Sequence, residues 1–298
     1  MIFWLFIYST GQHLFLPLQP DIGMELDGGK GPGRRLGQIN AIGGIAAIVG
    51  SAIVFAGFKF FKMNFKFAFM LCAAGFIVAA ILFFCMSSKP SKVEWKDKIK
   101  LKKEYLPYYW LTVLYGMRKQ IFLTFAPWVI VFIFNKKTSV LAFLFTIGRL
   151  VGVVYAPWLG RLIDKIGERK ILALESLILI PVCLAYGFSK FFFGIKTAFF
   201  IVAASFVIDQ LLMSVGMARA TFLKKIAINP EDVTVTLTVG TSIDHIFSIS
   251  VALIGGLIWD KLGYEILFLA AGVVALLNFI SVLLLIPSIK YQEDLSKD

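Results

Sequence analysis

Nine apolar runs, each close to the length of a membrane-spanning helix, constrain this chain more than any other feature. A helix needs about 20 mostly apolar residues to cross a bilayer, and it satisfies its own backbone hydrogen bonds in hydrocarbon. The sequence therefore predicts an all-α, polytopic membrane protein with about nine transmembrane helices. The predicted spans are residues 2–18, 37–58, 67–86, 106–133, 139–159, 171–188, 197–216, 234–258 and 265–287.

Composition agrees with a chain that is solvated mainly by lipid. Of its residues, 59% are hydrophobic and 16% are charged, against about 45–50% and about 25% in soluble domains. This excludes an ordinary soluble enzyme, a disulfide-rich secreted scaffold and a disordered chain. Three cysteines (Cys72, Cys85 and Cys183) lie inside apolar runs without metal-ligand spacing, so we interpret them as small core residues. We expect no metal and no cofactor.

The formal net charge of +12 has a membrane explanation, and we do not expect nucleic acid as a partner. Alternate loops between the spans hold 19 Lys and Arg residues on one side and 8 on the other. The richer side is cytoplasmic by the positive-inside rule. This predicts a multi-pass protein of the cell membrane whose N-terminus lies outside and whose C-terminus is cytoplasmic. The richer loops are 19–36, 87–105, 160–170, 217–233 and the tail after 287.

An internal repeat relates spans that lie six apart. At an offset of 197 residues, Gly43 falls on Gly240, and the Ala-Ala-Gly at 73–75 falls on the Ala-Ala-Gly at 270–272. Parallel repeats of six helices are a known layout of transporters. If the unit is six helices, the chain holds the last three of one unit and all six of the next. The basic stretch 87–105 would then link the two units, either lying on anionic lipid or as a solvated tether.

The loop after the fifth span carries a patterned sequence, Gly160-Arg-Leu-Ile-Asp164-Lys-Ile-Gly167-Glu-Arg-Lys170. Gly160 allows a helix end to approach a neighbour closely. Asp164 can accept hydrogen bonds from the exposed amides at the start of another helix. Gly167 permits a tight turn. A carboxylate held in this way is a latch that a domain movement could make or break. The alternative is an ordinary basic cytoplasmic loop.

This loop resembles the signature loop of the major facilitator superfamily of secondary transporters, which lies between helices two and three and recurs between helices eight and nine. The matching residues, which the resemblance implies form a gating motif, are Gly160, Asp164, Lys165, Gly167, Arg169 and Lys170. If this is the second copy, the chain begins at helix four and the first three helices are absent. The implied fold has two bundles, with residues 1–86 in the first, 87–105 as a cytoplasmic linker, and 106–298 as a complete six-helix bundle. The glycines of span 37–58 are interpreted as sites of close helix packing.

Ionisable residues inside spans are costly and mark a solute or ion pathway by default. Three basic and two acidic residues leave one surplus positive charge, which favours a polar or anionic solute. The alternative is neutralisation in structural pairs, Arg149 with Asp244 and Lys119 with Asp209. The candidates for binding or coupling are Arg118, Lys119, Arg149, Asp209, Asp244 and His245, with Gln12 and His13 from the first span.

The resemblance places some of these candidates on helices that line the central cavity of such transporters: Arg118 or Lys119, Asp209, and Gln12 with His13. Arg118 and Lys119 are about 100° apart on a helix, so we expect only one of them to face the cavity. Asp209, Asp244 and His245 are candidate proton carriers. Glu175 is predicted to be interfacial.

The sequence therefore predicts a secondary transporter that moves a small polar or anionic solute by alternating access, with ion or proton coupling. One alternative is a partial, non-transporting fragment that needs a partner. The other is an integral membrane enzyme, which the two widely separated histidines do not favour. No phosphate-binding Gly-x-x-x-x-Gly-Lys-Ser/Thr run is present for ATP-driven transport.

Overall fold

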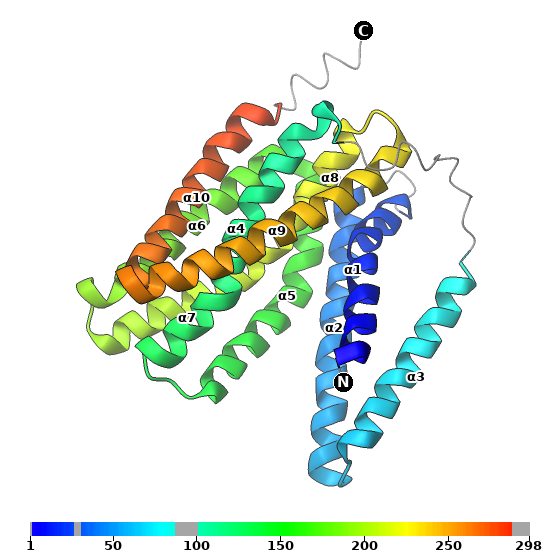
Figure 1. The fold of residues 1–298 in the computed structure, drawn as a ribbon, viewed down its shortest axis with the longest axis horizontal. Coiled ribbons are helices and arrows are strands. Elements are labelled where there is room, and N and C mark those ends of the chain that lie inside the picture. Colours follow the sequence, from blue (N-terminus) through cyan, green and yellow to red (C-terminus); the bar gives the residue numbers. More distant parts are fainter. Residues whose placement is uncertain (1, 27–30, 87–100, 288–298) are drawn as a thin grey trace.

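A computed structural model of the protein describes residues 2–26, 31–86 and 101–287, and all regular structure in these ranges is helical (Figure 1). The helices are α1 (Ile2–Glu25), α2 (Pro32–Phe60), α3 (Phe65–Phe84), α4 (Leu106–Trp128), α5 (Thr138–Ile166), α6 (Glu168–Phe192), α7 (Ile195–Leu212), α8 (Gly216–Ile226), α9 (Pro230–Leu262) and α10 (Tyr264–Leu285). Short segments η2 (Lys103–Tyr105), η3 (Val129–Ile133) and η4 (Met213–Val215) adjoin α4 and join α7 to α8.

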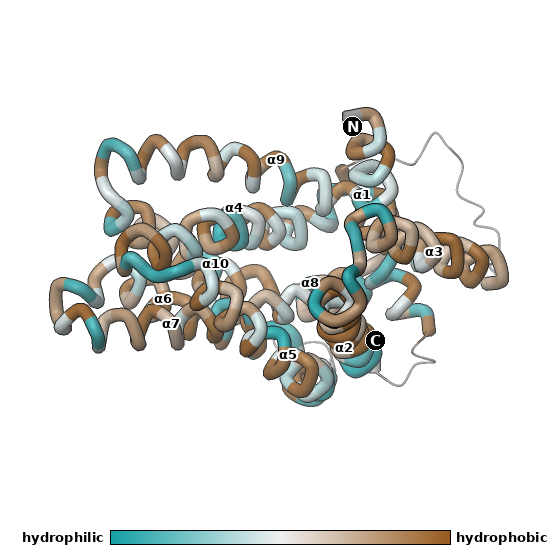
Figure 2. Tube along the Cα trace, turned by 90° about the horizontal axis from the view of Figure 1, so that it is seen from below, coloured by the Kyte–Doolittle hydropathy of each residue, from teal (hydrophilic) through white to brown (hydrophobic). Residues whose placement is uncertain are grey.

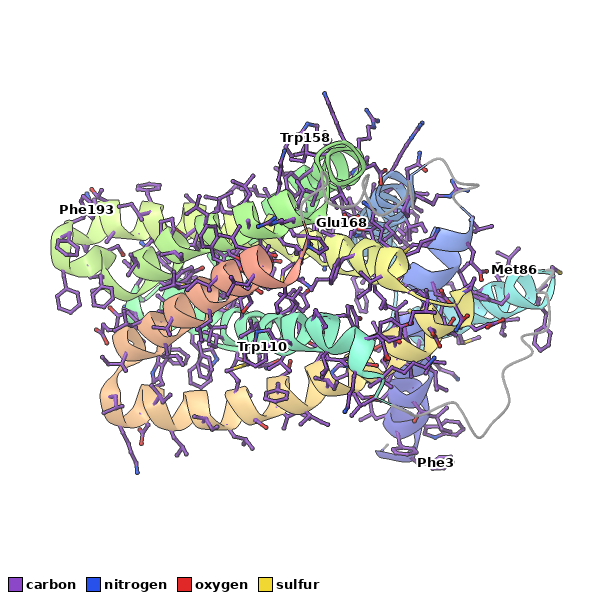
Figure 3. The ribbon with its side chains drawn as sticks, turned by 90° about the horizontal axis from the view of Figure 1, so that it is seen from above. Phe3, Met86, Trp110, Trp158, Glu168 and Phe193 are labelled. Atoms are coloured by element: carbon purple, nitrogen blue, oxygen red, sulfur yellow. The ribbon has the colours of Figure 1, made fainter. Side chains whose placement is uncertain are left out.

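The prediction of about nine spans is confirmed within the described ranges. Eight helical stretches are long and apolar enough to cross a membrane. The ninth long helix, α1, falls outside this group because Gln12 and His13 and two internal prolines, Pro17 and Pro20, lower its apolar character. Side chains such as Trp158 and Phe193 extend outward from the edge of the molecule (Figure 3), as expected of a surface that faces lipid.

The predicted boundary at residue 216 was wrong. The helical stretch that begins at Ile195 continues through η4 and α8 to Ile226. The sequence predicts a basic loop over residues 217–233, after the span 197–216. No proline occurs in residues 195–229, and the charge of Arg219 is neutralised inside the protein, as described below. The helix therefore has no reason to end at 216.

The helices from α4 to α10 share one buried core. Its centre is an aromatic cluster in which the rings of Tyr186 and Phe268 stack at 4.7 Å between centroids and Phe122 meets Tyr186 edge-on at 5.6 Å. In contrast, α3 has no buried residue. It stands apart in Figure 1 and is coloured hydrophobic over most of its length in Figure 2. The core of the described structure therefore lies mainly in residues 105–287, and Met24 of α1 and Leu36 of α2 join it.

Helices α2 and α5 approach each other closely at one end, through glycines. A Cβ atom at Gly33 would lie 2.6 Å from the carbonyl oxygen of Gly160, and one at Gly37 would lie 3.0 Å from Cα of Pro157. Close packing is therefore confirmed at Gly160 and Gly37. It does not extend along the whole span, because nothing lies within 4 Å of a Cβ built at Gly43 or Gly50. The opposite ends of α2 and α5 lie apart in Figure 1.

Only the last residues of the predicted linker 87–105 are described, and residues 87–100 lie outside the described ranges. Lys102 Nζ donates to Asp232 at 2.6 Å, and this hydrogen bond raises the pKa of Lys102. Tyr105 Oη donates to the same carboxylate at 2.8 Å and accepts from the backbone amide of Ile228 at 3.1 Å. The end of the linker is thus fixed to the first turn of α9.

Candidate functional site

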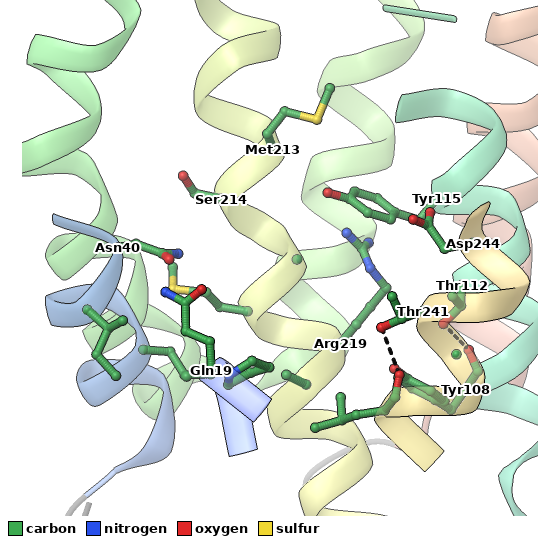
Figure 4. Close-up of a pocket in the computed structure, with 18 residues that line it drawn as sticks. Gln19, Asn40, Tyr108, Thr112, Tyr115, Met213, Ser214, Arg219, Thr241 and Asp244 are labelled. Carbon is green, nitrogen blue, oxygen red and sulfur yellow. Dashed lines mark hydrogen bonds between the residues drawn. The ribbon is translucent and has the colours of Figure 1, made fainter. Parts of the chain in front are cut away.

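A cavity of about 290 Å³ lies between α1 and α2 on one side and α4, η4, α8 and α9 on the other. Figure 4 shows Gln19 and Asn40 facing Arg219, Tyr115 and Asp244 across it. The helices that bound it come from both predicted bundles. The polar residues of its wall are Gln19, Asn40, Tyr108, Thr112, Tyr115, Ser214, Arg219, Thr241 and Asp244.

An adjoining cavity of about 500 Å³ reaches α5 and α7. It shares Gln19, Asn40 and Ser214 with the first cavity and adds Arg149 and Gln210. Arg149 is exposed, and it forms no ion pair or hydrogen bond with any other residue that the structure describes. The two cavities together form a polar region with an accessible positive charge.

Four buried charged residues form a network inside the helices α4 to α8. Arg118 Nη2 lies 2.6 Å from Asp209 Oδ1, and Arg118 Nη1 lies 3.7 Å from Glu175 Oε1. Arg219 Nη1 lies 3.3 Å from Glu175 Oε2. All four side chains are at most 6% exposed. The network contains two positive and two negative charges, so each buried charge has a partner, as buried charges require.

A second ion pair joins α4 to α9, where Lys119 Nζ donates to Asp244 Oδ2. The pairs named in the alternative interpretation do not form, because Arg118 pairs with Asp209 and Lys119 with Asp244, while Arg149 has no described partner. The reason is the 100° step between adjacent helical residues, which turns Arg118 toward α7 and Lys119 toward α9. Neither Arg118 nor Lys119 lines the two cavities, contrary to the expectation that one would.

The two histidines of the chain meet between α1 and α9, with ring centroids 4.8 Å apart. His13 Nδ1 lies 2.7 Å from the carbonyl oxygen of Ser9, which can only accept, so Nδ1 carries the proton. His245 Nε2 is buried and has no hydrogen-bond partner among the described atoms. The contact brings one imidazole from each predicted bundle together, next to Asp244. Gln12 is exposed and lines neither cavity.

The loop after α5, which carries the Gly160–Lys170 motif, contacts the start of α2. The carboxylate of Asp164 accepts from the backbone amide of Gly33 at 2.9 Å and from that of Arg34 at 2.7 Å. The predicted contact with the amides at a helix start is therefore confirmed. Gly167 has φ +84°, which confirms the predicted turn. Arg169 Nη2 donates to the carbonyl of Leu283 at 2.7 Å.

Other residues at this end of the molecule also join residues 2–60 to residues 106–287. Lys224 Nζ donates to the carbonyl oxygen of Met24 at 2.6 Å, and Thr234 donates to Asp21. We call this end, where Asp164, Lys224 and Thr234 meet α1 and α2, the Asp164 end. These contacts join α1 and α2 to the rest of the described structure at the Asp164 end.

Comparison with known families gives a match to the model of the Major Facilitator Superfamily over residues 28–227, which is more than half of the chain. The chain belongs to the major facilitator superfamily. With its apolar helices, this makes the protein a multi-pass membrane transporter of a solute. A search of curated proteins gives no match.

Within this superfamily fold, the structure adds two charged residues that the sequence did not assign to the site. Glu175 was predicted to be interfacial, but its side chain is 2% exposed and is shared by Arg118 and Arg219. Arg219 was counted among cytoplasmic loop charges. The signal that could have found Arg219 is the unbroken helical sequence from 195 to 226, which extends the span by three turns.

Metal binding has no support in the part of the chain that the structure describes. No group of three His, Cys, Asp or Glu side chains lies close enough there to hold a metal ion. Cys183 is buried and Cys72 and Cys85 are exposed, and none is in a disulfide. The prediction that Cys72 and Cys85 are core residues was wrong, because α3 contacts its neighbours only through scattered side chains and buries none of its residues in the described structure.

Proposed function

We propose that this transporter carries a small polar or anionic solute across the cell membrane by alternating access. Residues 1–86 and 106–298 are the two moving bundles in this proposal, and 87–105 connects them. The observation that carries it is the polar cavity whose wall is built from α1 and α2 on one side and α4, α8 and α9 on the other. A site between two bundles can open to either side when the bundles rock.

The contacts at the Asp164 end support a state that is closed on one side. We place that side in the cytoplasm, with the N-terminus of the chain outside and its C-terminus inside, because the basic loops predominate there. The motif residues Gly160, Asp164, Lys165, Gly167, Arg169 and Lys170 then form the cytoplasmic gate. Opening this gate requires the Asp164–Gly33 hydrogen bond to break.

The preference for an anion rests on Arg149. Its charge reaches a cavity, and it has no described counter-ion, whereas the buried network that contains Arg118 is internally neutral. An unpaired guanidinium binds carboxylate or phosphate through two parallel hydrogen bonds. In this proposal Arg118, Lys119 and Asp209 hold the helices of the site in place, and Arg149 attracts the solute.

Proton coupling is proposed for the histidine pair and Asp244. His13 and His245 belong to different bundles, so a change in their charge acts on the contact between the bundles. The charged groups that face His245 are Asp244 on its own helix, Lys119 on α4 and His13 on α1. Protonation of both imidazoles would make them repel each other and favour separation of α1 from α9.

Uptake into proteoliposomes tests the proposed function. The purified chain is reconstituted, and radiolabelled glycerate, lactate and glycerol 3-phosphate are supplied with and without an inward pH gradient. We expect uptake of at least one acid above that of empty liposomes, with a strong loss in Arg149→Gln. Lys190→Gln removes an exposed positive charge at the end of α6 and is the matched control. Absence of uptake of all three acids would contradict transport of small anions, and unchanged uptake in Arg149→Gln would remove its assigned role.

A further inference from the structure

Arg219 lines the first cavity, although its side chain is almost completely buried. We propose that Arg219, held against Tyr115 and beside Gly216, binds a single acidic group of the solute, a carboxylate or a phosphate. This rests on the proposed function and names the part of the solute that the site recognises.

The guanidinium of Arg219 is fixed on two sides. Its central carbon lies 3.7 Å from the centre of the Tyr115 ring, and its Nη1 lies 3.3 Å from Glu175 Oε2. Stacking on an aromatic face and pairing with a carboxylate leave the guanidinium little freedom to rotate. The donor fork is therefore held in one orientation before any solute arrives, which lowers the entropic cost of binding.

One donor nitrogen of Arg219, Nη2, has no hydrogen-bond partner in the described structure. Nη2 is buried and has no acceptor among the described residues. A buried donor without a partner is costly, and a guanidinium donor more so than a neutral one. Arg118 differs in this respect, because its Nη2 is taken by Asp209 at 2.6 Å. An acceptor supplied by the solute would form a hydrogen bond with Arg219 Nη2. This would remove the free-energy cost of the unpaired donor and thereby strengthen binding of the solute.

Gly216 lies beside this donor in the wall of the first cavity. A Cβ atom built at Gly216 would lie 3.5 Å from Arg219 Nη2 and 3.7 Å from Tyr115 Oη. These are ordinary van der Waals distances, so alanine fits here without displacing either group. Its methyl group would nevertheless occupy the volume beside Nη2. Gly216 is the first residue of α8 and directly follows η4, which is a more tightly wound 3-10 segment.

The other residues that line the cavity indicate which groups the solute carries besides its acidic group. Gln19, Asn40 and Thr241 line the cavity opposite or next to Arg219 and offer uncharged hydrogen-bonding groups (Figure 4). Asp244 is the one carboxylate among the lining residues and is paired with Lys119, so Arg219 is the one cationic side chain of this wall that is offered to an acidic group. A small acid that carries hydroxyl groups and one acidic function fits this wall best.

Three molecules of similar size separate the possibilities: glycerate, glycerol 3-phosphate and glycerol. They share a three-carbon polyol frame and carry a carboxylate, a phosphate and no charge. The measurement is the thermal unfolding midpoint (Tm) of the detergent-purified chain with each of them. Ligand at about a hundredfold excess over Kd should raise Tm by about 5 °C. We expect this for an acid and not for glycerol, and the acid that acts identifies the recognised group.

Two variants test whether the increase in Tm depends on Arg219 and Gly216. Arg219→Gln removes the charge, and Gly216→Ala covers Nη2 while keeping every charge. We expect the Tm increase to disappear in both and to persist in Lys190→Gln. Gly216→Ala keeps the test decisive if Arg219→Gln does not fold, because alanine is favoured over glycine in a helix. The proposal is overturned if neither acid raises Tm, if glycerol raises it equally, or if the increase survives Gly216→Ala.

Binding in detergent does not require transport, so the two proposals can fail separately. Acid-dependent stabilisation without uptake into liposomes would remove the proposed transport of small anions and keep the site. Uptake that is unaffected by Gly216→Ala would keep transport and remove the site.

Discussion

The carboxylate of Asp164 on α5 accepts a hydrogen bond of 2.9 Å from the backbone amide of Gly33 in the first turn of α2. The first amides of a helix have no partner within the helix, and a negative charge near them is favoured. Asp164 therefore caps a helix that belongs, by our division, to the other bundle. The cap exists only while the two bundles are together at this end.

Replacing Asp164 with asparagine should shift the balance between the closed and open states of the Asp164 end. Loss of the charge at the start of α2 costs about 1 kcal/mol, or roughly a fivefold change in the equilibrium. We expect turnover to fall severalfold while binding of the solute changes little. Asp260→Asn, an exposed acid at the end of α9, is the control. Equal loss of turnover and binding would contradict a latch.

Arg118 should matter for stability rather than for contact with the solute. Arg118→Ala leaves Asp209 buried without its 2.6 Å partner, and removing one member of a buried ion pair costs about 3–5 kcal/mol. We expect a marked decrease in the Tm of the purified protein. The double variant Arg118→Met, Asp209→Leu retains the Glu175–Arg219 pair and should recover much of the loss. A double variant no more stable than Arg118→Ala would show that the pair is not the cause.

The glycine contact between α2 and α5 offers a matched comparison within one helix. A methyl group at Gly37 would lie 3.0 Å from Cα of Pro157, whereas one at Gly43 would meet nothing within 4 Å. We expect Gly37→Ala to lower Tm by several degrees, because the two backbones must separate. Gly43→Ala should leave Tm unchanged or raise it slightly, since alanine is the better helix former. Equal effects of the two substitutions would contradict backbone contact at Gly37.

The histidine contact predicts a change in the pH dependence of uptake. His245→Gln keeps a polar side chain against His13 and removes an ionisable imidazole from the contact. We expect the rate of uptake to vary less with pH than in the unmodified protein, and His13→Gln to have a similar effect. The measurement is initial uptake at several pH values without a gradient. A pH profile that is unchanged in both variants would exclude the pair from coupling.

Sequence reasoning located the helices well because bilayer length and apolar composition are local properties. It also predicted the contact of Asp164 with a helix start, since a carboxylate after a glycine-marked helix end has few other favourable partners. The ion-pair partners of Arg118 and Lys119 could not be predicted from the sequence. Which of two adjacent side chains meets Asp209 depends on how α4 is rotated against α7 and α9, and that rotation is set by packing of the whole core.

The ion pair between Arg219 and Glu175 could not be predicted from the sequence either. Each looked like a charge at a membrane surface, because a charged residue normally ends an apolar run. Together they neutralise one another inside the protein, and this allows the helix to continue to Ile226. A pair of residues 44 positions apart cannot be recognised as mutual partners from either local sequence.

The position of Asp164 and Gly33 at the end of long helices has a mechanical consequence. Helix α2 has 29 residues, so its end lies about 22 Å from its midpoint at 1.5 Å per residue. A hydrogen bond is lost when its atoms move apart by about 1 Å. A tilt of α2 of about 3° about its midpoint is therefore enough to uncap it. A rotation too small to change the shape of the molecule visibly can thus decide whether Asp164 still caps α2, which is the step that opens the gate in the proposed mechanism.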